Sequence, residues 1–152
     1  MIEEIKYLEF SSEFSEKVKT FLIDVCIQEF GFEAWREELE TTDREKYKRT
    51  GGIFLIALDK NGDIIGTIGL ENMNDGVGLL KTMYVRKDYR GSKIAQNLMN
   101  TLINFSLKNN YTKLQLGTHK ELERAVNFYK KNGFYLKQED DNVLIFEKIL
   151  CN

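Results

Sequence analysis

The stretch from Leu79 to Ala95 combines residue types that suit the binding of a phosphate group. Its first part, 79–85, is an apolar run that ends in β-forming side chains, which predicts a buried strand. Arg90 and Gly91 follow, directly before a helical pattern. The first turn of a helix has backbone N–H groups without intrahelical partners and carries the positive end of the helix dipole, so it attracts phosphates. Because Gly91 lets the backbone approach a ligand closely, we expect a phosphate or diphosphate site at 90–95.

The helix after this loop is predicted from the spacing of its apolar side chains. They recur on one face at Ile94, Leu98, Leu102 and Phe105. The helix is expected to run from Ser92 to about Lys108. A short strand from Lys113 to Gly117 can lie parallel to the strand at 79–85 only through such a helical crossover.

Two segments of this chain resemble the motifs of the GNAT family of N-acetyltransferases. Residues 90–95 (Arg-Gly-Ser-Lys-Ile-Ala) resemble its acyl-CoA loop, Q/R-x-x-G-x-G/A, with Lys93 at the position of the first motif Gly. Lys93 brings a positive charge to the place where a diphosphate would lie. Residues 127–134 (Asn-Phe-Tyr-Lys-Lys-Asn-Gly-Phe) resemble the second motif, A-x-x-F/L-Y-x-x-x-G-F. The resemblance covers nearly the whole chain, with the segments in the expected order.

This resemblance implies acetyl-CoA as a cosubstrate, bound where the strand at 79–85 and the strand at Leu114 splay apart. The pantetheine arm would lie along the first strand as an added strand does, and a backbone N–H near Tyr84 or Val85 would hold the oxyanion. The residues that it implies for coenzyme A are Met83, Tyr84, Val85, Arg90, Gly91, Ser92, Lys93, Ile94, Ala95, Asn127 and Lys131.

The resemblance also assigns catalytic roles. Tyr129 is expected to be the general acid that protonates the departing thiolate, and a pKa of about 10 suits such a donor. The alternative is that Tyr129 is a core aromatic residue. Glu71, at a strand end where the family often has a carboxylate, is the expected base, against the alternative of a solvated charge. The base could also be His119, the only histidine of the chain, or a chain of water molecules.

The rest of the chain supplies the elements that must position these residues. Expected strands cover 2–10, 53–58, 64–71, 134–137 and 143–150. Expected helices cover about 12–29, up to the break at 30–32, and also 42–47 and 120–131. Asn61-Gly62 is a strong hairpin signal. We therefore expect one domain over 1–152 with an α/β (α+β) fold. It would have a mixed, mostly antiparallel sheet of about six to seven strands with helices on both faces, as in the GNAT fold.

The composition favours a globular protein in a reducing cytoplasm. Hydrophobic residues make up 42% and charged residues 30%, and the net charge of −2 gives no electrostatic footprint for nucleic acid. No apolar run is long enough to span a bilayer, and the N-terminus lacks the regions of a signal peptide. Cys26 and Cys151 make no disulfide framework, and with one histidine they make no zinc site.

The acceptor side carries the least specific signals. In the family, the region of Phe30, Phe32, Trp35, Tyr47, Glu37, Glu38, Glu40 and Asp43 lines the acceptor cleft. The alternatives are core aromatics and a solvated helix face. The favoured function is acetyl transfer from acetyl-CoA to a primary amine of a small molecule or peptide, by direct attack in a ternary complex. A non-catalytic acyl-CoA-binding regulatory module is the alternative, and a homodimer is left open.

Overall fold

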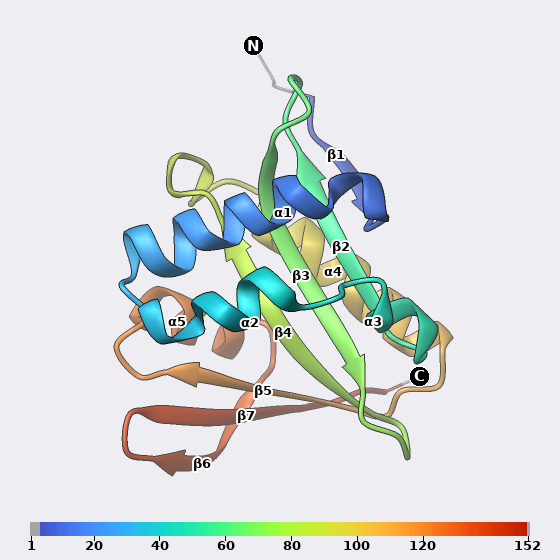
Figure 1. Cartoon of the computed structure of the whole chain (residues 1–152). Helices are drawn as coiled ribbons and strands as arrows, with labels where there is room; N and C mark the ends of the chain where they lie inside the picture. The colour runs from blue at the N-terminus through green and yellow to red at the C-terminus, as the bar shows by residue number, and fades with distance from the viewer. Residues whose placement is uncertain (1–3, 152) are drawn as a thin grey trace.

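Seven strands form a mixed sheet in the computed structural model, which describes residues 4–151 of the 152-residue chain. The strands are β1 (Lys6–Glu9), β2 (Ile53–Leu58), β3 (Ile64–Asn72), β4 (Val77–Val85), β5 (Lys113–His119), β6 (Tyr135–Asp140) and β7 (Val143–Ile149). Their order is β1-β2-β3-β4-β5-β7-β6, and every neighbouring pair is antiparallel except β4 and β5, which are parallel (Figure 1). The expected mixed, mostly antiparallel sheet is confirmed.

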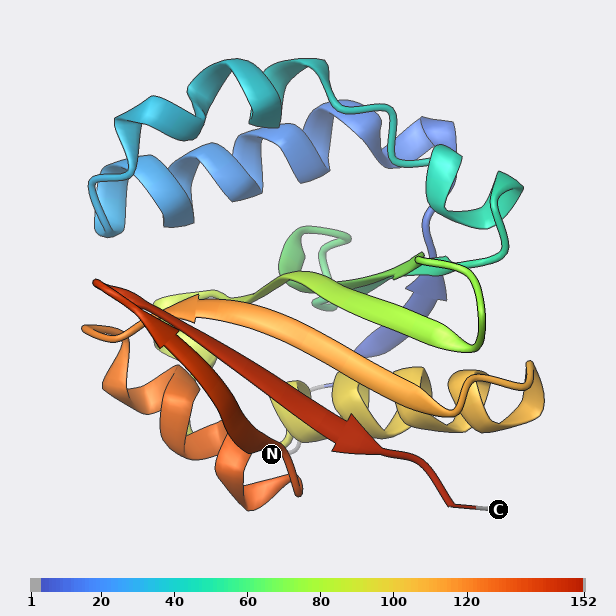
Figure 2. The same cartoon turned by 90° about the horizontal axis from the view of Figure 1, so that it is seen from below.

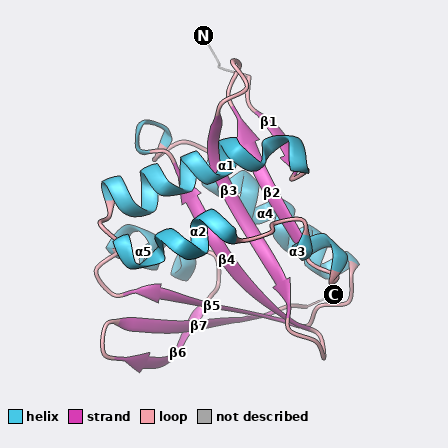
Figure 3. Cartoon of the chain, viewed as in Figure 1, coloured by secondary structure: helices cyan, strands magenta, loops and turns pink. Residues whose placement is uncertain are grey.

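Helices cover both faces of this sheet (Figures 2 and 3). One face carries α1 (Ser15–Leu22), η2 (Ile23–Glu29), α2 (Arg36–Thr41) and α3 (Lys46–Arg49), together with the short 3-10 turns η1 (Ser12–Phe14) and η3 (Glu33–Trp35). The other face carries α4 (Ile94–Lys108) and α5 (Glu123–Lys131), and η4 (Lys87–Tyr89) lies before α4. None of the helices within 4–151 is long and apolar enough to cross a membrane.

The core lies in two layers, one on each side of the sheet. Along β2, residues 53, 55 and 57 pack in the cluster that includes the apolar face of α4, whereas residues 54, 56 and 58 pack in the cluster that includes α1 and η2. All six side chains of β2 are buried. Because helices cover both faces, the strand reads as a continuous apolar run and shows no alternation with polar residues.

The first helix continues beyond the end of α1 as the π-helical segment η2. After Leu22 the chain widens into the π-helical segment η2, whose end is marked by an i→i−5 hydrogen bond of 3.2 Å from the N–H of Phe30 to the carbonyl of Val25. Such π-helical segments are frequent at functional sites. Here the segment carries Glu29 and Phe30 toward the end of β4, where the candidate site lies.

Several predicted boundaries differ from the structure. Helix α5 begins at Glu123, later than the expected start at 120, because a turn closed by the N–H of Leu122 on the carbonyl of His119 precedes it. The segment 139–140, expected in a turn, belongs to β6, an exposed edge strand that tolerates acidic side chains. The first strand, expected over 2–10, covers Lys6–Glu9, and residues 2 and 3 of the prediction lie outside the described residues.

Glu147 of β7 is a buried carboxylate among polar partners. Its side chain accepts hydrogen bonds from Gln115 Nε2 at 2.5 Å, from Lys137 Nζ at 2.9 Å and from Tyr135 Oη at 3.1 Å. These hydrogen bonds, that of Gln115 first, lower the pKa of Glu147 to about 2. The carboxylate therefore ties β5, β6 and β7 together on the sheet half that carries α5.

Replacing this carboxylate, Glu147→Gln, is expected to lower the free energy of unfolding at pH 7 by about 1.5–3 kcal/mol, the usual contribution of a hydrogen bond to a charged group. Because the folded pKa lies below the unfolded value of about 4.3, the stabilisation is complete above pH 5 and is lost as the pH falls toward 2. Urea unfolding at pH 7 and pH 3 measures both effects, with the exposed Glu139→Gln as control. An equal loss of stability on acidification in the wild type and in Glu147→Gln would contradict this role.

Candidate active site

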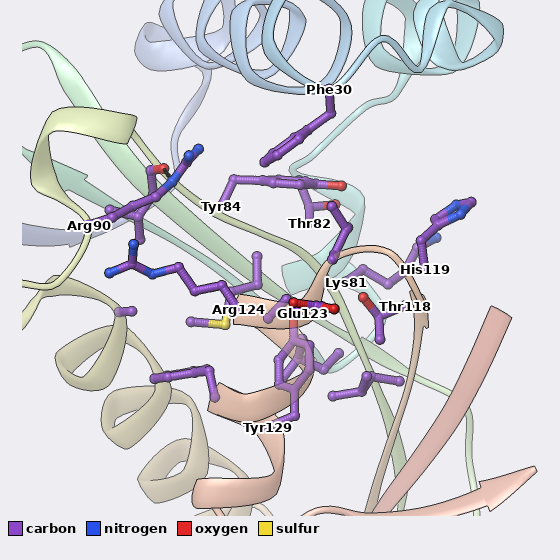
Figure 4. Close-up of a pocket in the computed structure, with 18 of the residues that line it drawn as sticks. Phe30, Lys81, Thr82, Tyr84, Arg90, Thr118, His119, Glu123, Arg124 and Tyr129 are labelled. Atoms are coloured by element: carbon purple, nitrogen blue, oxygen red, sulfur yellow. Dashed lines mark hydrogen bonds between the residues drawn. The ribbon is translucent and has the colours of Figure 1, made fainter. Parts of the chain in front are cut away.

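The sheet opens between β4 and β5. The two strands pair from Val77 with Lys113 to Leu79 with Gln115, and no further pair follows. Beyond this point residues of both strands, from Leu80 and Leu116 on, line a pocket of about 690 Å³ (Figure 4). The splay that the resemblance implies is therefore present. Strands that separate in this way leave backbone donors and acceptors free for a ligand.

A β-bulge bends β4 at the wall of this pocket. The register shifts between Thr67 and Gly69 of β3, so that one residue of β3 faces two of β4. Thr82 there adopts a φ of +55°, and its carbonyl accepts a 2.8 Å hydrogen bond from Thr67 Oγ1. The bulge sets the direction of the peptide groups that follow it along the pocket.

Val85 presents its backbone N–H to the pocket edge of β4. The N–H of Arg86 donates to the carbonyl of Ile65 in β3 at 2.8 Å. In an antiparallel strand, successive N–H groups point to opposite edges. The N–H of Tyr84 therefore faces β3, whereas that of Val85 faces the opening. Of the two oxyanion donors expected from the sequence, the strand geometry favours Val85.

The loop between β4 and α4 lines the pocket with Tyr89, Arg90, Gly91 and Ser92. Ala95, in the first turn of α4, lines it as well. Gly91 has a φ of +81°, a left-handed conformation that strongly favours glycine. Ser92 Oγ donates to the carbonyl of Tyr89 and accepts a 3.4 Å hydrogen bond from the N–H of Ile94, which fixes the loop to the first turn of α4.

Two predicted loop residues do not line the pocket. Ile94 is buried in the core, with its side chain against Gly66 of β3. Lys93 is exposed and precedes the first residue of α4. The side chain at the position of the missing motif glycine thus lies outside the pocket lining.

Arg90 is held by partners on the opposite helical layer. Its guanidinium makes a bidentate ion pair with Glu29 at the end of η2, with one contact of 2.7 Å, and its Nε donates to the carbonyl of Val85 at 3.0 Å. It also lies 5.3 Å from the ring centre of Phe30. Arg90 therefore connects the loop to the helix end that covers the pocket.

Tyr129 rises from α5 into the pocket, as Figure 4 shows. The residue is 6% exposed, and its ring packs edge-on against Phe134, with 5.9 Å between the ring centres. Burial raises the pKa of the phenol well above its usual value. The hydroxyl therefore stays protonated throughout the neutral range, as a proton donor requires.

The two candidate bases lie in different surroundings. Glu71 forms a 3.2 Å ion pair with Lys81 Nζ, and its side chain is not part of the pocket lining. His119, at the end of β5, lines the pocket and stacks on Phe32 with 4.8 Å between the ring centres. Of these two side chains, the structure brings only His119 to the pocket.

An aromatic wall covers the pocket from the side of η2 and η3. Phe30 and Trp35 line it, and Phe32 stacks on Trp35 at 4.4 Å. Tyr47, also expected here, is a buried core residue that packs on Phe54. The acidic residues of this region, Glu37, Glu38, Glu40 and Asp43, are not part of the lining, and Glu40 and Asp43 pair with Arg36 and Arg49.

Cys26 lies beneath this wall, beside the hydroxyl of Tyr84. Burial raises the pKa of the Cys26 thiol to about 11, although the hydrogen bond with Tyr84 and the charge of Arg44 lower it. The thiol is therefore protonated near neutral pH and is a poor nucleophile. Within residues 4–151 no group of three or more His, Cys, Asp and Glu side chains is arranged to hold a metal ion.

Helix α5 adds lining residues that the family motifs do not include. Of the two predicted there, Lys131 lines the pocket, whereas Asn127 is exposed and does not. Glu123 and Arg124, in the first turn of α5, also line it (Figure 4). Arg124 precedes Lys131 by seven residues, two helical turns, and this spacing was the signal available in the sequence.

Comparison with known proteins gives consistent matches. The family model described as "Acetyltransferase (GNAT) family" matches residues 20–134. An uncharacterised N-acetyltransferase of Schizosaccharomyces pombe is 34% identical over 118 residues, which are 74% of this chain and 72% of that protein. The N-acetylaspartate synthetase of Xenopus tropicalis is 29% identical over 102 residues, which are 66% of this chain and only 37% of the synthetase.

Solved structures share the fold over nearly the whole chain. An acetyltransferase of the GNAT family from Staphylococcus aureus superposes with a TM-score of 0.87 at 26% identity, covering 97% of this chain and all of that one. The PaiA N-acetyltransferase of Thermoplasma acidophilum, solved in complex with coenzyme A, superposes with a TM-score of 0.81 at 22% identity, covering 97% and 99% of the two chains.

Proposed function

We propose that this chain, which belongs to the GNAT family of acetyltransferases, transfers the acetyl group of acetyl-CoA to a primary amine of a small molecule or peptide. The observation that carries this proposal is the continuous pocket between β4 and β5. It runs from the loop at 90–95, past the free strand edge and Tyr129, to Trp35 and His119. One end suits a phosphate-bearing donor, and the other end suits an acceptor.

The positions of the loop and of the free strand edge suggest one orientation for acetyl-CoA in this pocket. Its diphosphate would lie on the backbone amides of the loop at Gly91 and Ser92, close to the N-terminus of α4. Its pantetheine arm would follow the unpaired edge of β4, from Val85 toward Met83, with the backbone hydrogen bonds of an added strand. The coenzyme A bound to the T. acidophilum protein of the same fold supports this assignment.

The chemistry follows from the order of groups along the pocket. The nitrogen of the neutral amine attacks the thioester carbonyl, and the N–H of Val85 stabilises the oxyanion that forms. The C–S bond then breaks, and Tyr129 donates its proton to the thiolate. The nitrogen releases one proton as the amide forms, and a proton returned through solvent restores the hydroxyl of Tyr129. The products are the N-acetylated amine and free coenzyme A. Attack is proposed to be direct, in a ternary complex, and the buried, protonated state of the Cys26 thiol supports this because it makes Cys26 a poor acyl carrier.

The base that takes the proton of the ammonium group is Glu71, His119 or a water chain. The variants Glu71→Gln and His119→Gln distinguish these three possibilities. Loss of the side chain that acts as the base lowers kcat/KM and changes its dependence on pH on the acidic side of the profile. We expect a decrease of about tenfold or more for whichever side chain acts as the base. If both variants keep the wild-type profile, both side chains are excluded and the water chain is left.

The experiment that tests the proposed function is amine-dependent release of the coenzyme A thiol. The panel should contain aspartate, because two relatives are N-acetylaspartate synthetases, and also other amino acids, arylalkylamines, polyamines and a peptide N-terminus. We expect thiol release with at least one amine, and one added acetyl group in the product by mass spectrometry. Binding of acetyl-CoA without turnover of any amine would favour a non-catalytic acyl-CoA-binding module.

A further inference from the structure

Four cationic side chains line the pocket, and they differ in whether a carboxylate already neutralises them. They are Lys81, Arg90, Arg124 and Lys131. Lys81 is ion-paired with Glu71, and Arg90 is held by both carboxylate oxygens of Glu29. For Arg124 and Lys131, the described part of the chain contains no ion pair or hydrogen-bond partner of the side chain. An anionic ligand can therefore bind to Arg124 and Lys131 without breaking an ion pair within the protein.

Of these two unpaired cations, Arg124 lies over the loop at 90–95. A Cβ atom built on Gly91 would be 3.2 Å from Nη2 of Arg124, with no other atom within 4 Å among those compared. The guanidinium of Arg124, which extends from α5, therefore lies against the backbone of the loop at Gly91. Figure 4 shows Arg90 and Arg124 on the same side of the cavity, with the side chain of Arg124 extended toward the loop.

The cationic side chains of the loop itself are not free within the pocket. Arg90 is occupied by Glu29, and Lys93 lies outside the pocket lining. The backbone amides of the loop supply hydrogen bonds but no full positive charge, whereas a diphosphate carries two negative charges. An arginine is suited to this task because its planar guanidinium donates two parallel hydrogen bonds to phosphate oxygens.

We infer that Arg124 binds the diphosphate of the acyl donor and supplies the charge that Arg90 and Lys93 do not. This inference rests on the proposed function, because it assumes coenzyme A as the ligand. It adds a donor-binding residue from α5, outside the loop motif.

Calorimetric titration of the full chain tests the inference with three ligands. Coenzyme A carries the diphosphate and a 3′-phosphate, dephospho-coenzyme A lacks the 3′-phosphate, and pantetheine lacks both. We expect Arg124→Ala to weaken coenzyme A and dephospho-coenzyme A equally, by about tenfold to a hundredfold, and to leave the affinity for pantetheine unchanged. Arg124→Lys should recover part of the loss, because a lysine keeps the charge without the planar fork.

Lys130→Ala is the matched control, since Lys130 is an exposed cation of the same helix that does not line the pocket. It should bind all three ligands as the wild type does. Unchanged affinity of Arg124→Ala for coenzyme A would overturn the inference. A loss for coenzyme A without a loss for dephospho-coenzyme A would also overturn it, because the contact would then be with the 3′-phosphate. If the wild type itself binds no coenzyme A, it is the proposed function that fails.

Discussion

Replacing Tyr129 by phenylalanine is expected to lower kcat by about tenfold to a hundredfold and to leave the KM for acetyl-CoA nearly unchanged. The variant loses only the proton donor for the departing thiolate, and a thiolate is already a fair leaving group, so the loss falls at the low end of general acid catalysis. Because burial raises the pKa of Tyr129 above its usual value of about 10, the wild type should show no loss of rate from ionisation of this residue below pH 10. Steady-state kinetics from pH 6 to pH 10 measure both effects.

The matched control is Tyr111→Phe, which also removes one partly buried hydroxyl. Tyr111 Oη donates to the carbonyl of Gly51 at 2.6 Å, and Tyr111 does not line the pocket. This variant should lose about 1 kcal/mol of stability and keep its kcat. A full kcat in Tyr129→Phe would contradict the assignment of the general acid and would leave Tyr129 as a core aromatic residue.

A larger effect is expected from the backbone N–H of Val85. Exchange of this residue for the corresponding α-hydroxy acid replaces the N–H by an ester oxygen and keeps the side chain. If this N–H holds the oxyanion, kcat should fall by about 10² to 10³, the usual cost of losing one such donor. The donor lies in β4, a strand paired with β3 on its other edge, so the fold should survive the exchange.

The same exchange at Tyr84 separates catalysis from sheet stability. The N–H of Tyr84 faces β3, so its loss should cost about 1 kcal/mol of stability and little of kcat. If instead the ester at Tyr84 lowers kcat more than the ester at Val85, the oxyanion donor has been placed on the wrong residue.

Much of this architecture could be predicted because it follows from local patterns. The apolar run of β2, the Asn61-Gly62 hairpin and the helical spacing from Ile94 each fix an element within a few residues. The parallel pairing of β4 and β5 then follows from the helical crossover between them. The loop before α4 requires the conformational freedom of glycine at Gly91, and the structure gives this residue a φ of +81°.

The contacts of the site could not be read from such patterns, because they join distant parts of the chain. The ion pair of Arg90 with Glu29 spans 61 residues, and it depends on where the π-helical segment η2 ends. The position of Arg124 over Gly91 depends on how α5 packs against the loop. Glu71 looks available as a base in the sequence, but its ion pair with Lys81 becomes visible only once β3 and β4 are in register.

The most direct test of the central claim is the melting temperature of the chain with acetyl-CoA, with ATP as the control for phosphate binding in general. A ligand that binds only the folded state at a hundred times its Kd adds about 2.7 kcal/mol, which for a chain of this size raises Tm by about 5 to 10 °C. We predict such a shift with acetyl-CoA and a much smaller one with ATP. No shift with acetyl-CoA, or an equal shift with ATP, would contradict the claim that the opening between β4 and β5 is an acyl-CoA site.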